Sequence, residues 1–415
     1  MNQVYSANMP HQWTRSTRLH VVMYAVLLVA TPFILLRNYM VEAIAYFTNS
    51  SVELFSISFK AVPIAALLVA LTGLYLFRSY LTRYLISAIS LALILNGLAQ
   101  QVTDYYFGHN FYDLQQNWHY FAYAIYSCLL YRDLSLRGWP AYKIMLVAYF
   151  SAFGLSAFDE IFQRHMSSRV FDICDIAKDV YGAYIGIILV FIGIQHSQIF
   201  SKNWRTIRHR KLIGYYKHPF TLLIFLFILS FVFISISSIL TDPQYWYIAS
   251  GLTIGFFILI FAIIHLSQFK IPRYIMPAIL AIAIVVQGFF FIKHRHDNVV
   301  YTSYGLTVYK GIPIPYFDFM IYPNGMFRLV DKKHYFNNRD RNFFLTMKSD
   351  IIIVSSGVYG KGGKGFPDAE NAFVYNPSIK EGTQIIILKN NEAVETFNRL
   401  KSEGKKVLLI FHNTC

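Results

Sequence analysis

Long apolar runs constrain this chain more than any other feature, because about 20 apolar residues suffice for a helix to cross the hydrocarbon core of a bilayer. The chain is 55% hydrophobic and only 14% charged, with a mean hydropathy of +0.41, which argues against a soluble globular protein. We therefore predict a polytopic α-helical membrane protein with about nine transmembrane helices. The predicted spans are Leu19–Leu36, Ala61–Phe77, Leu85–Ala99, Trp118–Tyr131, Ile144–Phe162, Ile176–Ile194, Phe220–Leu240, Trp246–Leu266 and Ile275–Ile292. The first run is too long for a signal peptide and lacks a small-residue cleavage site, so we expect it to remain as a helix.

The net charge of +15 is distributed as in a membrane protein rather than a nucleic-acid-binding one. Basic residues concentrate in alternate loops, most densely between His196 and Lys217, where no acidic residue occurs. Such an excess of Lys and Arg is typical of cytoplasmic loops. The pattern predicts a cytoplasmic N-terminus, membrane lipids as partners and no nucleic acid. An odd number of spans then places the C-terminal domain outside the cytoplasm.

The composition divides the chain into five parts: an N-terminal tail (1–16), a six-helix membrane domain (17–195), a basic cytoplasmic loop (196–217), a three-helix membrane segment (218–293) and a soluble α/β domain (294–415). In the last part, β-rich runs alternate with turns at 306–311, 317–322, 326–330, 350–357, 384–389 and 406–411. Pro323-Asn324-Gly325 is a hairpin turn signal. Residues 391–404 read as one amphipathic helix, with Ala393, Val394, Phe397 and Leu400 facing inward and Gly404 at its end. We expect a small domain with a mixed sheet and a helix.

A row of carboxylates leads into the sixth predicted span. Asp172, Asp175, Asp179, Gly182 and Gly186 follow one another at steps of three or four residues, which places them on one face of a helix. An Asp at mid-depth in a bilayer costs roughly 2.5–3.5 kcal/mol on insertion scales, so a row of them indicates a role. The two glycines would let another helix pack closely on the same face.

A second acidic group ends the fifth predicted span. Asp159 and Gln163 are one helical turn apart, Glu160 follows Asp159, and Arg169 is the nearest basic candidate to offset these charges. Five carboxylates against one or two arginines leave an excess of acid. This favours a ligand, substrate or cation site, while a structural ion-pair cluster joining two helices remains the alternative.

His119 and Tyr123 begin the fourth predicted span on the same predicted side of the membrane. A histidine beside carboxylates can transfer protons near neutral pH. Both residues could equally belong to the aromatic belt at the membrane interface.

Taken together, these motifs resemble the VanZ-like membrane family over about residues 85–195: His119-x-x-x-Tyr123, Asp159-Glu160-x-x-Gln163, Arg169, Asp175 and Asp179-x-x-Gly182-x-x-x-Gly186. The chain lacks the lysine that the family places before this histidine, and it has Asp179 where asparagine is common, so its site is more acidic. The resemblance implies an integral protein of the bacterial inner (plasma) membrane, from a family associated with resistance to a glycopeptide antibiotic. It also implies a site made of Asp159, Glu160, Gln163, Arg169, Asp175, Asp179, His119 and Tyr123, to which the helical spacing adds Asp172.

The C-terminal part resembles the adipogenesis-associated Mth domain family over about residues 303–415, most specifically from Glu392 to Cys415. That family includes an assembly factor of respiratory complex I. The resemblance implies a protein partner for this domain.

The glycine-rich stretch from Gly357 to Gly365 lacks the Gly-Lys-Ser/Thr ending of a phosphate-binding loop, and Phe366-Pro367-Asp368 follow it instead of a helix. We interpret it mainly as a flexible insert, with nucleotide binding or a basic contact loop for an anionic surface as alternatives. His412 and Cys415 have no carboxylate near them in sequence, which makes a nucleophile pair a minor alternative. Three scattered cysteines favour neither a disulfide framework nor a metal site, so no cofactor or metal is predicted.

Three functions fit these features. The leading hypothesis is an envelope protein of the VanZ-like type that binds or modifies a lipid-linked, glycan or amine-bearing envelope ligand at an acidic extracytoplasmic pocket. The others are a proton- or cation-coupled carrier and a non-catalytic docking protein acting through the C-terminal domain. Whether the protein is an enzyme stays open.

Overall fold

The computed structural model describes residues 18, 21–22, 24–25, 46, 50–54, 57–76, 78–103, 114–163, 171–195, 211–241, 243–332, 334–336, 338–366, 371–376 and 381–414. The chain divides into two compact units. One comprises residues 1–100 and 110–234, and the other comprises residues 101–109 and 235–415. Each unit is described by itself.

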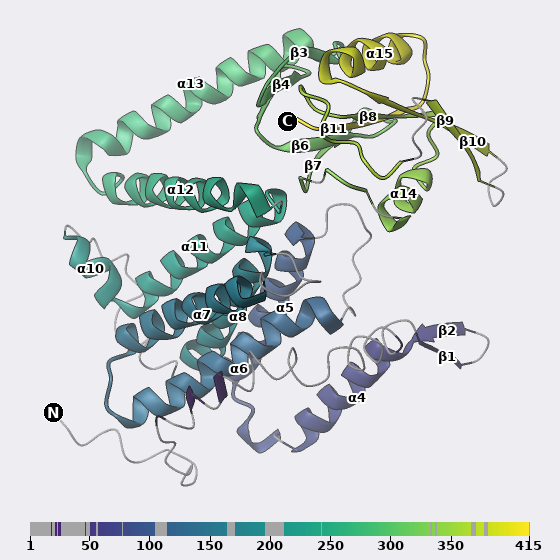
Figure 1. Cartoon of the computed structure of the whole chain (residues 1–415). Coiled ribbons are helices and arrows are strands. Elements are labelled where there is room, and N and C mark those ends of the chain that lie inside the picture. The colour runs from purple at the N-terminus through teal and green to yellow at the C-terminus, as the bar shows by residue number, and fades with distance from the viewer. Residues whose placement is uncertain are drawn as a thin grey trace. The chain divides into compact units, whose positions relative to one another are not determined.

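The first unit is helical (Figure 1). Its elements are the hairpin β1 (Ser51–Leu54) and β2 (Ile57–Lys60), α4 (Ala61–Leu76), the short η1 (Arg78–Tyr80), α5 (Arg83–Thr103), α6 (Leu114–Leu136), α7 (Ala141–Gln163), α8 (Ile173–Ile188), the π-helical turn η2 (Leu189–Ile194), α10 (Leu212–Lys217) and most of α11 (Pro219–Ile239). Helix α8 is buried along nearly its whole length, so it forms the centre of this unit.

Six described helices are long and apolar enough to cross a membrane: Arg83–Thr103, Ala141–Phe162, Ile173–Ile194, Pro219–Ile239, Trp246–Leu266 and Lys270–His294. They coincide in position with six of the nine predicted spans. The predicted span Leu19–Leu36 lies largely outside the described residues. The predicted span Ala61–Phe77 corresponds to α4, which has 16 residues and is shorter than the usual span. The predicted span Trp118–Tyr131 lies within the 23 residues of α6, whose polar side chains lower its hydropathy.

The second unit contains η3 (Pro243–Tyr245), α12 (Trp246–Leu266) and α13 (Lys270–His294), followed by the α/β domain (Figure 1). A three-stranded antiparallel sheet has the order β3 (Val299–Ser303), β4 (Leu306–Tyr309), β5 (Ile312–Pro315). A six-stranded sheet has the order β7 (Phe327–Val330), β6 (Asp318–Ile321), β11 (Val407–Phe411), β8 (Ile351–Ser355), β10 (Glu381–Leu388), β9 (Asn371–Asn376). Its three central strands β11, β8 and β10 are parallel and the outer pairs are antiparallel, so the predicted mixed sheet is confirmed.

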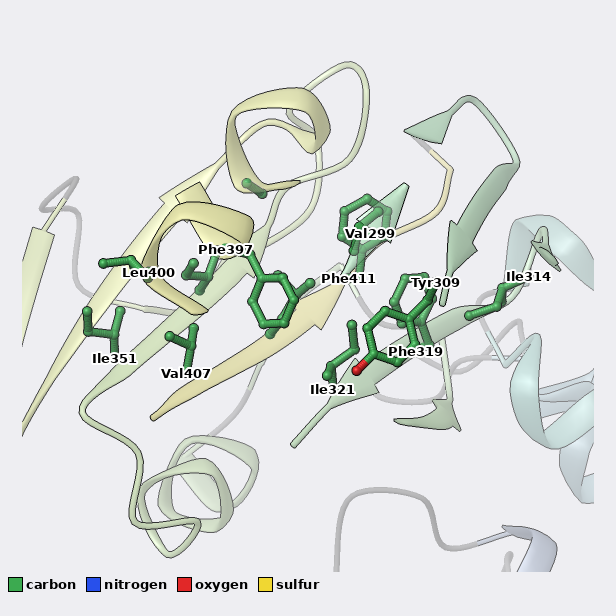
Figure 2. Close-up of a cluster of buried hydrophobic side chains, with 13 residues drawn as sticks. Val299, Tyr309, Ile314, Phe319, Ile321, Ile351, Phe397, Leu400, Val407 and Phe411 are labelled. Carbon is green, nitrogen blue, oxygen red and sulfur yellow. The ribbon is translucent and has the colours of Figure 1, made fainter. Parts of the chain in front are cut away.

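The larger sheet is buried on both faces, which explains why its central strands are continuous apolar runs. Alternate residues of β8 point to opposite sides: Ile351 and Ile353 belong to one core, Ile352 and Val354 to the other. The first core is covered by α15 (Asn390–Ser402) and by residues of the smaller sheet. Figure 2 shows Phe397 and Leu400 of this helix on that side of the sheet. The second core is covered in part by α14 (Asn338–Leu345).

Most predicted elements of this domain are present. The predicted helix is α15, with Ala393, Phe397 and Leu400 buried, Val394 packed against them and Gly404 following its end. The predicted turn is closed by the 2.9 Å hydrogen bond that Gly325 N donates to Tyr322 O. Strands β3, β5 and β9 and helix α14 were not predicted, because they are short and two of them contain Pro or many polar residues.

Candidate functional site

Helix α8 carries the centre of the candidate site. Asp175 and Asp179 are one turn apart, and Gly182 and Gly186 continue the same face toward α6. A Cβ atom at Gly182 would lie 2.7 Å from the Cα and O atoms of Tyr120, and one at Gly186 would lie 2.8 Å from Ser127 Cβ. The glycines therefore let the backbones of α6 and α8 approach closely, as the spacing predicted.

This close approach brings His119 of α6 onto the carboxylates of α8. His119 Nδ1 donates a hydrogen bond of 2.9 Å to Asp179 Oδ1, and Nε2 lies 3.8 Å from Asp175 Oδ1. The side chain of Asp179 is 9% exposed, whereas those of His119 and Asp175 are 18% and 25% exposed. The histidine thus connects a buried carboxylate to one that solvent can reach.

Two further polar residues of this cluster were not among the predicted site residues. Ser156 of α7 donates a hydrogen bond of 2.6 Å to Asp179 Oδ2, and Lys178 Nζ lies 2.8 Å from Asp175 Oδ1. Ser156 is three and four residues before Asp159 and Glu160, and Lys178 is three residues after Asp175. Helical spacing therefore contained a signal for both residues.

Asp172 and Glu160 act at the beginning of α8. Asp172 is the N-cap residue rather than a member of the helix, and its Oδ1 accepts a hydrogen bond of 2.7 Å from Cys174 N. Glu160 Oε2 accepts a hydrogen bond of 2.9 Å from the backbone nitrogen of Asp172, which ties α7 to α8. Burial, together with the Asp175 carboxylate, raises the pKa of Asp172 to about 6. These two carboxylates therefore support the helix end, a structural role that the excess of acid alone did not indicate.

The remaining predicted residues divide into two groups. Tyr123 is buried on α6. The side chain of Gln163 and the whole of Arg169 lie outside the described residues. In the described part of the site, Lys178 rather than an arginine lies beside the acidic row.

The arrangement places two carboxylates, an imidazole, a hydroxyl and an ammonium group on three packed helices. Such a set can bind a cationic group or move a proton between the two carboxylates through the imidazole. Within the described residues, no group of three or more His, Cys, Asp or Glu side chains is arranged to hold a metal ion.

No protein-family model and no curated protein matches the chain. Among solved structures, the protein titled MT938 is 21% identical to this chain, covers 28% of it and 98% of its own length, and has a TM-score of 0.23. A conserved hypothetical protein, PH1505 from Pyrococcus horikoshii OT3, is 22% identical over 28% of this chain and 99% of its own length, also with a TM-score of 0.23.

Proposed function

We propose that this chain is a polytopic membrane protein of the bacterial cell envelope, of the VanZ-like type, whose α6–α7–α8 cluster binds an amine-bearing envelope ligand. The observation that carries the proposal is the contact of His119 with both Asp175 and Asp179 in a cluster that is rich in acid. Among the described residues, the carboxylates of Asp175 and Asp179, and those of Glu160 and Asp172 at the start of the same helix, lie with one lysine and one histidine. A site with this charge balance favours a cationic ligand group over an anionic one.

The exposed fractions indicate which carboxylate meets the ligand. Asp179 is held by His119 and Ser156 and is nearly buried, so it orients the imidazole. Asp175 is more exposed and pairs with Lys178 on its helix. We infer that a ligand amine displaces or joins Lys178 at Asp175, while His119 supplies proton transfer if the ligand is modified.

Lipid binding by the full chain in detergent tests the proposal. Phosphatidylethanolamine, which carries an amine, should raise the thermal unfolding temperature more than phosphatidylglycerol, which does not. Asp175→Asn should abolish this difference and keep the fold, because the exposed carboxylate is replaced by a group of the same shape. The control variant is Asp297→Asn, which removes an acid from the exposed pair with His294. Equal shifts by the two lipids in the unmodified protein would contradict an amine-recognising site.

A proton-coupled carrier is the second candidate, because the hydrogen bond between His119 and Asp179 joins two proton-transfer groups, one of them on the apolar helix α8. Proteoliposomes loaded with a pH-sensitive dye distinguish the two functions. Acidification that depends on His119 without any preference for amine-bearing lipid would favour the carrier.

A further inference from the structure

The C-terminal domain contains a second polar cluster, at the carboxyl ends of the parallel strands β8, β10 and β11. Ser355 ends β8 and is followed by Ser356, Asn390 begins α15 two residues after β10, and His412 follows β11. The carboxyl ends of parallel strands lie at one edge of a sheet, and ligands of α/β domains bind at that edge. The sequence had given this region only minor alternatives: nucleotide binding or a basic contact loop at Gly357–Gly365, and a nucleophile pair at His412 and Cys415.

His412 is held by a buried ion pair. Its Nδ1 contacts Asp318 Oδ2, and Asp318 Oδ1 accepts a hydrogen bond of 2.7 Å from Lys332 Nζ. All three side chains are at least nine-tenths buried. No carboxylate lies near His412 in the sequence. In the structure its carboxylate partner comes from β6, about a hundred residues earlier in the chain. Asp318 thus joins His412 and Lys332 in one buried polar group below the strand edge.

The glycine-rich stretch from Gly357 to Gly365 covers this edge. Gly362 N donates a hydrogen bond of 2.8 Å to Ser356 O, and a Cβ atom at position 362 would lie 2.7 Å from the His412 ring. Gly363 packs against Val354 and Ile387. The stretch therefore lies directly on the polar cluster, and only glycine leaves room for the imidazole at position 362.

Asn390 adds an amide at the first turn of α15. Its Oδ1 accepts the hydrogen bond of Ser355 Oγ, and its backbone nitrogen donates to Gly357 O at 3.3 Å, so its side chain lies where β8, the glycine-rich stretch and α15 meet. Asn390 is 2% exposed, and no described residue accepts a hydrogen bond from its Nδ2 atom. A buried donor without an acceptor is costly, which indicates that an acceptor from outside the chain completes it.

Three exposed lysines lie around the same point. Lys361 and Lys364 belong to the glycine-rich stretch, and Lys389 is the N-cap residue of α15, where no side-chain hydrogen bond caps the helix. Lys389 contacts the stretch, since its Cε is 3.5 Å from the position of a Cβ at Gly360. The N-terminus of a helix attracts anions through its backbone N–H groups and its dipole.

We propose that this edge of the sheet, bounded by the glycine-rich stretch and the N-terminus of α15, binds the phosphate group of a small soluble molecule. The Nδ2 atom of Asn390 donates to a phosphate oxygen, and Lys361, Lys364 and Lys389 offset its charge at the surface. His412 lies beneath the stretch at Gly362, with Asp318 and Lys332 fixing its position. A small soluble ligand suits the site better than a lipid headgroup, because Gly362 and Gly363 are buried and leave little room for a bulky substituent.

Hydrogen exchange of the full chain in detergent, with inorganic phosphate and pyrophosphate as probes, tests this site. Either probe should slow amide exchange in residues 357–365 and in the first turn of α15. Lys389→Gln should weaken phosphate binding by about tenfold, because it removes a charge-assisted contact. Lys405→Gln is the matched control, since it removes an exposed lysine three residues beyond the opposite end of the same helix and should leave binding unchanged.

Three results would overturn the proposal: no protection of residues 357–365 at millimolar phosphate, equal effects of the two lysine substitutions, or protection by anionic lipid vesicles alone. Asn390→Ala gives an independent readout. It should reduce phosphate binding, whereas Ser402→Ala, which removes an exposed hydroxyl at the other end of α15, should not.

Discussion

His119 of α6 and Asp179 of α8 are joined by a hydrogen bond of 2.9 Å between Nδ1 and Oδ1, although 60 residues separate them in the chain. The bond exists because Gly182 and Gly186 let the two helices approach until their backbones nearly touch. The close packing of α6 and α8 therefore also sets the geometry of the site.

The energetic coupling of this pair can be measured with a double-mutant cycle. Asp179→Ala should lower the free energy of unfolding by about 3–5 kcal/mol, because it breaks a buried pair and leaves the imidazole without its carboxylate. The change should be smaller when His119 is already alanine. Denaturant unfolding of the purified protein in detergent provides the four values. Additive effects of the two substitutions would show that the hydrogen bond contributes nothing to stability.

The glycine contacts predict opposite signs for two similar substitutions. Gly186→Ala should destabilise the protein by about 1–3 kcal/mol, because the new methyl group meets the backbone of Ala124 and cannot be accommodated by a side-chain movement. Gly154→Ala on α7 should be neutral or stabilising by up to about 1 kcal/mol, since no atom lies within 4 Å of its Cβ position and alanine favours a helix. Thermal unfolding of both variants decides the matter. Destabilisation by both would place the cause in the helices themselves rather than in the contact between α6 and α8.

The buried pair of Asp318 predicts a loss of stability in acid. Burial opposes ionisation of this carboxyl, but His412 and Lys332 outweigh it and hold the pKa of Asp318 below its usual value. Its folded pKa is thus lower than its unfolded pKa of about 3.9, so the pair stabilises the domain above that pH and loses this contribution as the pH falls through the folded pKa. Hydrogen exchange of β6 and β11 in the full chain should show Asp318→Asn less protected than the unmodified protein at neutral pH. The two proteins should converge below about pH 4; a constant difference down to strong acid would contradict the linkage.

The side of the membrane occupied by the C-terminal domain remains a prediction from the loop charges. Nine spans after a cytoplasmic N-terminus place residues 294–415 outside, with the basic loop at 196–217 inside. A phosphatase fused after Cys415 should therefore be active, and a fluorescent protein at the same position should be dark. The reverse result would mean that one of the weaker spans, α4 or α6, does not cross.

Local sequence patterns identified most of the elements. Apolar length predicted the six long apolar helices, and the alternation of β-rich runs and turns predicted β4, β6, β7, β8, β10 and β11. The sequence pattern did not predict β5 or the short polar helix α14. The Ile-Pro-Ile-Pro sequence of β5 has no strand signal, because proline cannot donate a hydrogen bond to a neighbouring strand. Those two elements owe their structure to the surfaces on which they pack.

The sequence by itself determined that Asp175, Asp179, Gly182 and Gly186 share one helical face, because helical periodicity is a local property of the backbone. It did not determine that Asp172 would cap α8 or that Ser156 and Lys178 would join the acidic row, since those contacts depend on where neighbouring turns and helices come to lie. Only the tertiary structure decided that Asp318 would meet His412 beneath the glycine-rich stretch. That contact requires β6 to pair with β11 across about 90 residues, and long-range strand pairing depends on the burial of the whole sheet rather than on any short segment.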